Sequence, residues 1–305
     1  MSYIQTLIEQ IIVMFLFIGL GVFIGKKKLF SETTIKELGD FLFKFIAPIN
    51  VVNSLMIGYS DERAKQLLIS LLISVVVYVL SIVVSNFVLN YKKYPVEHYS
   101  AIISNCGFMC LPIVLYVCGN DAGIYATPFI ACNICLQMTY GNFIMSGDKN
   151  EIKLKSILTN TSVIGVIVGF IYFFARIPVI GPLKTCCSSL SALVAPFSCI
   201  LIGINLANTN LIACLKDKMG FVAILLRQIV MPLIAVMLMY FIDNDMYVMK
   251  LALVIVVAAP VASGTSVFAR KYNRDYEMAS RLVCVSTLLT IITIPLITTI
   301  ATLIW

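Results

Sequence analysis

Charged residues are scarce in this sequence. Only 12% of its 305 residues are Asp, Glu, Lys or Arg, whereas 60% are hydrophobic. A water-soluble domain carries about 25% charged residues, so the composition excludes an ordinary soluble globular protein. Backbone polar groups inside lipid must be satisfied within the protein, and long apolar runs achieve this as helices. The sequence therefore predicts an all-α integral membrane protein.

Motifs for catalysis and nucleotide binding are also missing. No GxxxxGK[ST] loop occurs, which excludes a pump driven by nucleotide hydrolysis on this chain alone. The apolar runs contain no cluster of His, Asp and Glu, so we expect neither an enzyme nor a metal site or cofactor. Once the apolar runs are counted, no length remains for a nucleic-acid-binding domain, and no nucleic-acid partner is expected.

Apolar runs alternate with short polar breaks along the whole chain. A spanning helix needs about 20 apolar residues, and ten such runs fit. The first run is too long for a signal-peptide core and has no basic residue before it, so we expect it to remain a helix. The predicted spans are Ile4–Gly25, Ile35–Ile57, Leu67–Leu89, Tyr99–Cys118, Ile124–Met145, Ile157–Ala175, Leu183–Leu206, Met219–Ile242, Leu251–Ala269 and Ala279–Leu303.

Basic residues are distributed unevenly between the loops. The loops after even-numbered spans hold five: Arg63, Lys65, Arg176, Lys184 and Lys250. The loops after odd-numbered spans hold thirteen: Lys26, Lys27, Lys28, Lys92, Lys93, Lys149, Lys153, Lys155, Lys216, Lys218, Arg270, Lys271 and Arg274. Cytoplasmic loops carry the excess of Lys and Arg, so we predict that both termini are extracellular. The net charge of +7 reflects this topology rather than an acidic partner.

The positions of several prolines suggest an internal repeat. Ala47-Pro48 in span two and Ala195-Pro196 in span seven are 148 residues apart, and so are Pro112 in span four and Pro260 in span nine. A repeat of five spans must come out inverted. We therefore predict two inverted five-helix repeats, residues 1–148 and 149–305. Inverted repeats with interrupted helices are typical of secondary transporters, whose sites lie near the membrane midplane.

Spans four and nine carry the residues that interrupt helices. Span four contains Asn105-Cys-Gly107 and Pro112, and span nine contains Pro260 followed by Ser263 and Gly264. Proline removes a backbone donor, and glycine tolerates an unwound backbone. One such span alone would favour an ordinary proline kink. Two at matched positions favour broken helices that cross.

The amino end of a broken helix attracts anions, because its free N–H groups carry a partial positive charge. Uncharged polar side chains nearby would orient a bound carboxylate, although such side chains also hold membrane helices together. The candidates are Asn50, Asn53, Ser54, Asn105, Asn133, Gln137, Asn205, Ser263 and Thr265.

Charged residues within the spans are few. Only Glu9 and Asp40 of the 15 acids lie well inside a span, and neither is in span four or nine. Proton- and sodium-coupled antiporters place carboxylates at the crossing, so this pattern argues against a sodium/proton antiporter. Asp40 and Lys44 lie four residues apart and are expected to neutralise each other. Arg227 in span eight is expected to extend to the cytoplasmic surface, with attraction of an anion as the alternative.

Span nine and its exit resemble a motif of the auxin efflux carrier family, which includes bacterial carboxylate permeases and the plant PIN-FORMED exporters. Pro260-x7-Phe-Ala-Arg-Lys-Tyr-Asn273 resembles a proline crossover followed by FA[KR]xYN. Asn105, seven residues before Pro112, resembles the family's Asn-x6-Pro. Ile49-Asn50-x-x-Asn53 is a weaker match. The similarity extends over essentially the whole chain in the order and number of spans.

The resemblance implies a fold similar to that of bile-acid symporters and sodium/proton antiporters. Spans 1, 2, 6 and 7 would form a dimerising scaffold, and spans 3–5 and 8–10 a transport unit whose broken helices cross at Pro112 and Pro260. The family exports organic anions by an elevator-like movement. Asn105, Pro112 and Pro260 would shape the substrate site, and the polar residues of span two would line it.

These observations predict a plasma-membrane secondary transporter, a homodimer that exports small carboxylates or auxin-like acids. Plant exporters carry a long loop between spans five and six, whereas here only about residues 146–156 connect them, which favours a small carboxylate over auxin. One alternative is a sodium- or proton-coupled organic-anion symporter. Another is a membrane sensor that binds a ligand without moving it.

Overall fold

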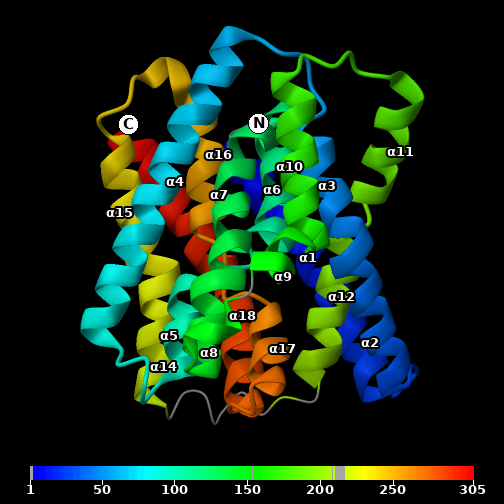
Figure 1. The fold of residues 1–305 in the computed structure, drawn as a ribbon, viewed down its shortest axis with the longest axis vertical. Helices are drawn as coiled ribbons and strands as arrows, with labels where there is room; N and C mark the ends of the chain where they lie inside the picture. The colour runs from blue at the N-terminus through cyan, green and yellow to red at the C-terminus, as the bar shows by residue number, and fades with distance from the viewer. Residues whose placement is uncertain (1–2, 153, 208, 210–216) are drawn as a thin grey trace.

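The computed structural model describes residues 3–152, 154–207, 209 and 217–305. Helices cover most of each predicted range over these residues, two ranges are interrupted by extended segments, and the expected all-α fold is confirmed (Figure 1). Two basic residues from the topology count, Lys153 and Lys216, lie outside the described residues.

The first five helical stretches occupy residues 3–146. Two are interrupted only by wide π-helical turns, and the fourth is broken by an extended segment. Their elements are α1 (Tyr3–Lys26), α2 (Glu32–Phe41), η1 (Leu42–Ile46), α3 (Ala47–Leu55), α4 (Asp61–Val88), α5 (Pro95–Ile102), η2 (Cys106–Cys110), α6 (Leu111–Cys118), η3 (Asn120–Ala122), α7 (Gly123–Leu136), η4 (Gln137–Gly141) and α8 (Asn142–Ser146).

The remaining stretches occupy residues 149–304, and the ninth predicted range is also broken by an extended segment. Their elements are η5 (Lys149–Glu151), α9 (Leu154–Leu158), α10 (Thr161–Phe174), α11 (Gly181–Ser191), α12 (Val194–Ala207), α14 (Lys218–Leu225), η6 (Leu226–Val230), α15 (Met231–Met239), η7 (Asn244–Met246), α16 (Tyr247–Val257), α17 (Gly264–Lys271) and α18 (Tyr276–Ile304).

Several of these helices begin where the sequence provides a capping side chain. Ser31 caps α2, Ser60 caps α4, Asn160 caps α10, Asp217 caps α14 and Asp275 caps α18, each by accepting a backbone N–H of the first turn. Such caps satisfy donors that have no partner inside the helix.

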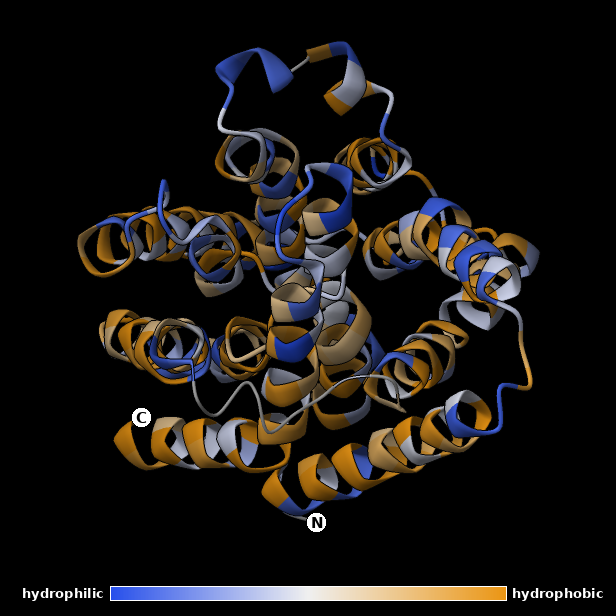
Figure 2. Cartoon of the chain, turned by 90° about the horizontal axis from the view of Figure 1, so that it is seen from below, coloured by the Kyte–Doolittle hydropathy of each residue, from blue (hydrophilic) through white to orange (hydrophobic). Residues whose placement is uncertain are grey.

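Six stretches of the described chain are long and apolar enough to cross a membrane, and a bent pair, η5–α9 with α10, makes a seventh. The six are residues 3–26, 32–55, 61–88, 181–207, 218–239 and 276–304. Large apolar side chains project outward from them: Leu16 is 69% exposed and Phe87 is 88% exposed. Hydrophobic residues predominate on the outer helices seen from below (Figure 2). The chain is therefore a multi-pass membrane protein.

The helices form two groups. Figure 1 shows α2, α3, α10, α11 and α12 on one side and α4, α5, α14 and α15 on the other, with both termini at the same end. Helix α1 packs along α12 of the first group so closely that a Cβ built on Gly21 would lie 2.2 Å from the Ile200 carbonyl oxygen. A Cβ on Gly165 of α10 would lie 2.8 Å from the Pro48 carbonyl oxygen of α3.

The core of the molecule centres on α16. Every residue of α16 from Met249 to Val257 is buried. A helix that is apolar around its whole circumference belongs in the interior, and α16 leads directly into the break of span nine. The two broken stretches therefore meet in the centre of the protein, shielded by the outer helices.

Three prolines explain three of the wide π-helical turns. Pro48, Pro112 and Pro232 each stand at the start of an α-helix, immediately after η1, η2 and η6. A proline inside a helix lacks an N–H and collides with the carbonyl four residues earlier, and a π turn relieves that collision by inserting a residue. The freed carbonyl of Phe108 accepts a hydrogen bond from the Ser198 hydroxyl of α12 at 3.3 Å.

The prediction that spans four and nine cross at Pro112 and Pro260 is half wrong. Pro260 lies in the break of span nine, but Pro112 lies inside the second half of span four. The break of span four is at residues 103–105, and Ser104 pairs with Val261 across the crossing. These partners are 157 residues apart, not 148. Pro112 forms a π turn instead of a break.

Candidate functional site

The two broken stretches cross as a short antiparallel pair of extended segments. The Asn105 N–H donates to the Pro260 carbonyl at 2.8 Å, and the Ala262 N–H donates to the Ile103 carbonyl at 3.2 Å. An extended backbone inside a membrane protein must find hydrogen-bond partners within the protein. Here each segment supplies partners for the other.

Asn133 of α7 satisfies the remaining backbone groups of Ser104. Its Oδ1 accepts the Ser104 N–H at 3.0 Å, and its Nδ2 donates to the Ser104 carbonyl at 2.9 Å. The same Oδ1 accepts the Tyr78 hydroxyl of α4 at 2.8 Å. Asn133 was predicted to bind substrate, and the structure places its amide against the crossing backbone, where it fixes the extended segment.

Arg227 lies behind the crossing, and the prediction that it reaches the cytoplasmic surface is wrong. Its side chain is fully buried. Nη1 donates to the carbonyl of Ile102, the last residue of α5, at 3.0 Å, and Nη2 donates to the carbonyl of Val257, the last residue of α16. One guanidinium thus caps the carboxyl ends of both half-helices.

The π turn η6 allows two adjacent residues of span eight to point inward. Gln228 follows Arg227 and is 1% exposed; its Nε2 donates to the Ser286 carbonyl of α18 at 2.8 Å. The Ser286 hydroxyl accepts the Val261 N–H at 3.1 Å. The crossing is therefore held by side chains from α7, span eight and α18. Sequence inspection missed Gln228, whose only signal was its place beside an intramembrane arginine and before Pro232.

In each broken span a second helical segment begins after the break: η2 with α6 in span four, and α17 in span nine. The amino ends of these segments carry polar side chains that have no partner among the described residues. Asn105 precedes η2 and Ser263 precedes α17, and neither caps the following turn with its side chain. Among the residues that the structure describes, neither amide atom of Asn105, which is 2% exposed, has a hydrogen-bond partner, and nor does the buried hydroxyl of Thr265. A buried polar group without a partner costs about 1–3 kcal/mol. Such groups at two helix amino ends are typical of a site that accepts a polar ligand.

Gln137 and Tyr99 lie beside the amino end of α17. A Cβ built on Gly264 would lie 2.8 Å from Nε2 of Gln137, so the amide is packed against the first turn. The Tyr99 hydroxyl faces the same Gln137 side chain, and its ring packs against Phe268 with centroids 5.6 Å apart. Gln137 was among the sequence candidates, whereas Tyr99 was read only as the start of a span.

The polar residues of span two lie on α3, and their hydrogen bonds run within α3 or to α11. Asn53 accepts the Lys184 ammonium at its carbonyl, at 2.6 Å, and the Ser188 hydroxyl at its side chain, at 3.0 Å, both from α11. The Ser54 hydroxyl donates to the Asn50 carbonyl at 3.0 Å. Asn53 therefore joins α3 to α11, whereas the bond between Ser54 and Asn50 lies within α3. Asn205, another candidate, is exposed on α12.

Asp40 and Lys44 form the predicted ion pair, with Lys44 Nζ 2.8 Å from Asp40 Oδ2.

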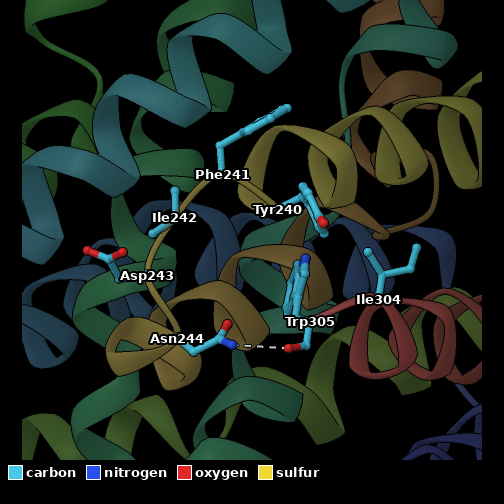
Figure 3. Close-up of a pocket in the computed structure, with 7 residues that line it drawn as sticks. All are labelled: Tyr240, Phe241, Ile242, Asp243, Asn244, Ile304 and Trp305. Atoms are coloured by element: carbon cyan, nitrogen blue, oxygen red, sulfur yellow. Dashed lines mark hydrogen bonds between the residues drawn. The ribbon is translucent and has the colours of Figure 1, made fainter.

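An open hollow of about 470 Å³ lies elsewhere, between the end of α15 and the end of α18 (Figure 3). It is lined by Tyr240, Phe241, Ile242, Asp243, Asn244, Ile304 and Trp305. Asp243 is the only charged side chain of the lining. The ammonium of Lys250 lies against the lining residues Asn244, at 2.9 Å, and Trp305, so its charge is engaged by the protein there.

The family model described as "Membrane transport protein" matches residues 6–160 and 154–298. The chain belongs to this family, the auxin efflux carriers. Its members are membrane transporters, not enzymes, and the resemblance seen at Asn105 and in span nine is confirmed at the level of the family. A comparison with curated proteins returns no match.

Proposed function

We propose that this auxin efflux carrier family protein is a secondary transporter that exports small organic anions across the plasma membrane. It binds them at the crossing of spans four and nine. The observation that carries the proposal is the pair of uncapped half-helix amino ends with the unpartnered amide of Asn105 and hydroxyl of Thr265. A carboxylate would accept hydrogen bonds from these groups and from the free N–H groups of the first turns.

In this proposal the chain spans the membrane ten times as two inverted repeats, with extracellular termini and basic loops in the cytoplasm. Spans 1, 2, 6 and 7 form a dimeric scaffold, against which the remaining spans move as an elevator. Pro260, Ser263 and Asn133 shape the site, and Asn50, Asn53, Ser54 and Pro112 belong to the surfaces around it. An inside-negative potential drives a monovalent anion outward with about 2.3 kcal/mol per 100 mV.

Replacing Asn105 by Ala tests the site. Because the Asn105 side chain has no protein partner, its removal should leave folding intact. One lost hydrogen bond to a charged substrate costs about 1.5–3 kcal/mol, so binding should weaken about 10-fold to 100-fold. The purified protein is first screened against carboxylic acids by thermal shift, and affinity and counterflow in proteoliposomes are then measured for the acid that stabilises it.

Asn86→Ala is the matched control, since Asn86 is exposed on α4 and its amide contacts the Tyr140 hydroxyl, outside the proposed site. Unchanged affinity in Asn105→Ala would exclude the crossing as the substrate site. Saturable binding without counterflow in the wild type would instead identify a sensor.

A further inference from the structure

The carboxyl ends of two half-helices converge at Arg227. A helix carboxyl end carries about −0.5 of an elementary charge, concentrated on its last carbonyl groups. The last residues of α5 and α16 both direct a carbonyl at the same guanidinium. Together the two ends present about one negative charge, which one guanidinium balances.

The arginine has no acidic partner among the described residues. The ionisable side chains that face it are Tyr78, Cys106 and Cys110, which are neutral at physiological pH. Burying an unpaired cation in a membrane protein is costly. Among the described residues, the positive charge of Arg227 is therefore balanced by the backbone carbonyls at the ends of α5 and α16. The buried charge needs these carbonyls, and the crossing needs the charge to hold the two helix ends together.

Discontinuous helices in secondary transporters commonly hold a coupling cation at unwound carbonyls and half-helix carboxyl ends. We propose that Arg227 is the fixed cation of this crossing and occupies the place that a bound monovalent cation would otherwise take. It is a positioning residue, because it holds the carboxyl ends of α5 and α16. Asn105 and Thr265 lie beyond the breaks that follow these two helices. Transport then needs no sodium ion at this place.

This inference rests on the proposed function for its meaning in transport, but its test does not. The charge is removed in Arg227→Gln, which keeps hydrogen-bond donors, and is retained in Arg227→Lys, which loses the planar fork. Lys65→Gln removes a cation from the exposed face of α4 and is the control. Melting temperatures of the purified proteins are measured in sodium, potassium, lithium and choline chloride at equal ionic strength.

The wild type, Lys65→Gln and Arg227→Lys should each melt at a temperature independent of the cation, with the lysine variant close to the wild type. Arg227→Gln should melt about 10 °C lower in choline. Sodium, potassium or lithium should raise the melting temperature of Arg227→Gln in a saturable way. In this variant the carboxyl ends of α5 and α16 lack their cation, so a small metal cation can bind in its place. Proteoliposome counterflow of Arg227→Gln should be stimulated by the same cation.

Three results would overturn the proposal. One is a loss of stability in Arg227→Gln that is the same in all four salts, which indicates lost donors rather than lost charge. Another is a cation-dependent wild type. The third is an unchanged melting temperature with lost substrate binding, which would assign Arg227 to the substrate. Should Arg227→Gln not accumulate, Arg227→Lys decides: a stable, salt-independent protein supports the assignment, and failure of the lysine variant contradicts it.

The two proposals fail separately. Absence of counterflow in the wild type would remove the proposed function, whereas the salt dependence of the melting temperature would still report the charge at the crossing.

Discussion

Two asparagines at the crossing illustrate how one residue type serves opposite purposes. Asn133 uses both amide atoms to hold Ser104, whereas the amide of Asn105 has no partner in the protein. A satisfied buried amide stabilises the fold, and an unsatisfied one costs free energy unless a ligand supplies the missing hydrogen bonds. The contrast separates the residue that fixes the backbone from the residue proposed to bind substrate.

Asn133→Ala should strongly lower the melting temperature. It leaves the N–H and the carbonyl of Ser104 unpaired in the protein interior, at about 1–3 kcal/mol for each group. Tyr78→Phe is the matched control, because it removes one hydrogen bond to the same amide and keeps Asn133 in place, for about 0.5–1.5 kcal/mol. Equal melting temperatures for the two variants, measured by thermal unfolding in detergent, would show that Asn133 does not hold the crossing.

Sequence inspection found Asn105 but misread Arg227. The asparagine stands two residues before Gly107 in an interrupted apolar run, and that local signal is sufficient to single it out. The partners of Arg227 are backbone carbonyls at Ile102 and Val257, 125 and 30 residues away along the chain. Every residue has a backbone carbonyl, so the sequence does not show which carbonyls will accept hydrogen bonds from an arginine. The sequence therefore shows the cation in the span but not the groups that neutralise it.

At the scale of helices, the closest packing is between α1 and α12. Gly21 faces Gly203, and Gly25, four residues later, faces Ala207, so small residues on both helices bring the backbones together. In a membrane this contact depends on van der Waals packing, since lipid offers apolar surface as favourable as that of another helix.

Gly21→Ala should separate α1 from α12. The added Cβ would lie 2.2 Å from the Ile200 carbonyl oxygen, which is backbone and cannot rotate away. Overpacking of this kind costs about 1–3 kcal/mol, and the melting temperature should fall. Gly19→Ala is the control on the same helix: a Cβ there has nothing within 4 Å, and alanine favours a helix, so its melting temperature should stay equal or rise. A similar fall in both variants would contradict the close packing of α1 on α12.

The helical character of the chain follows from the sequence, because runs of apolar residues and capping side chains are local signals. The position of the break in span four does not. Proline predicts a disturbance of the helix, but a disturbed helix can widen into a π turn, as at Pro48, Pro112 and Pro232, or open completely, as at Pro260. The partners decide between these outcomes: Ser198 satisfies one carbonyl beside Pro112, whereas Asn133 and span nine satisfy a whole extended segment at Ser104.

At the scale of the molecule, the elevator proposal requires two helix groups, the proposed scaffold of spans 1, 2, 6 and 7 and the transport unit of the remaining spans, to slide past each other. Their contacts include Ser198 of α12 with the Phe108 carbonyl, and α3 with the amino end of α7. The ring of Phe43 in η1 also packs against that of Phe108 in η2, with centroids 4.8 Å apart. A single hydroxyl bond and apolar packing can be exchanged for similar contacts when the groups move. By contrast, the crossing lies within one group and is fixed by Asn133, Arg227 and Ser286, so we expect it to move as a rigid unit.

A disulfide between the groups should therefore stop transport. A Cβ built on Gly123 of α7 lies 3.2 Å from the Ser54 Cβ of α3, and a disulfide needs about 3.5–4.5 Å between Cβ atoms. In a background with the ten native cysteines replaced, Ser54→Cys with Gly123→Cys should lose counterflow on oxidation, regain it on reduction and keep substrate binding.

Ser266→Cys with Ser280→Cys is the control, because these hydroxyls lie 3.2 Å apart on α17 and α18 within the moving unit. Its oxidation should leave counterflow intact. Counterflow that persists with the first pair fully oxidised would rule out sliding between α3 and α7 and, with it, the elevator movement.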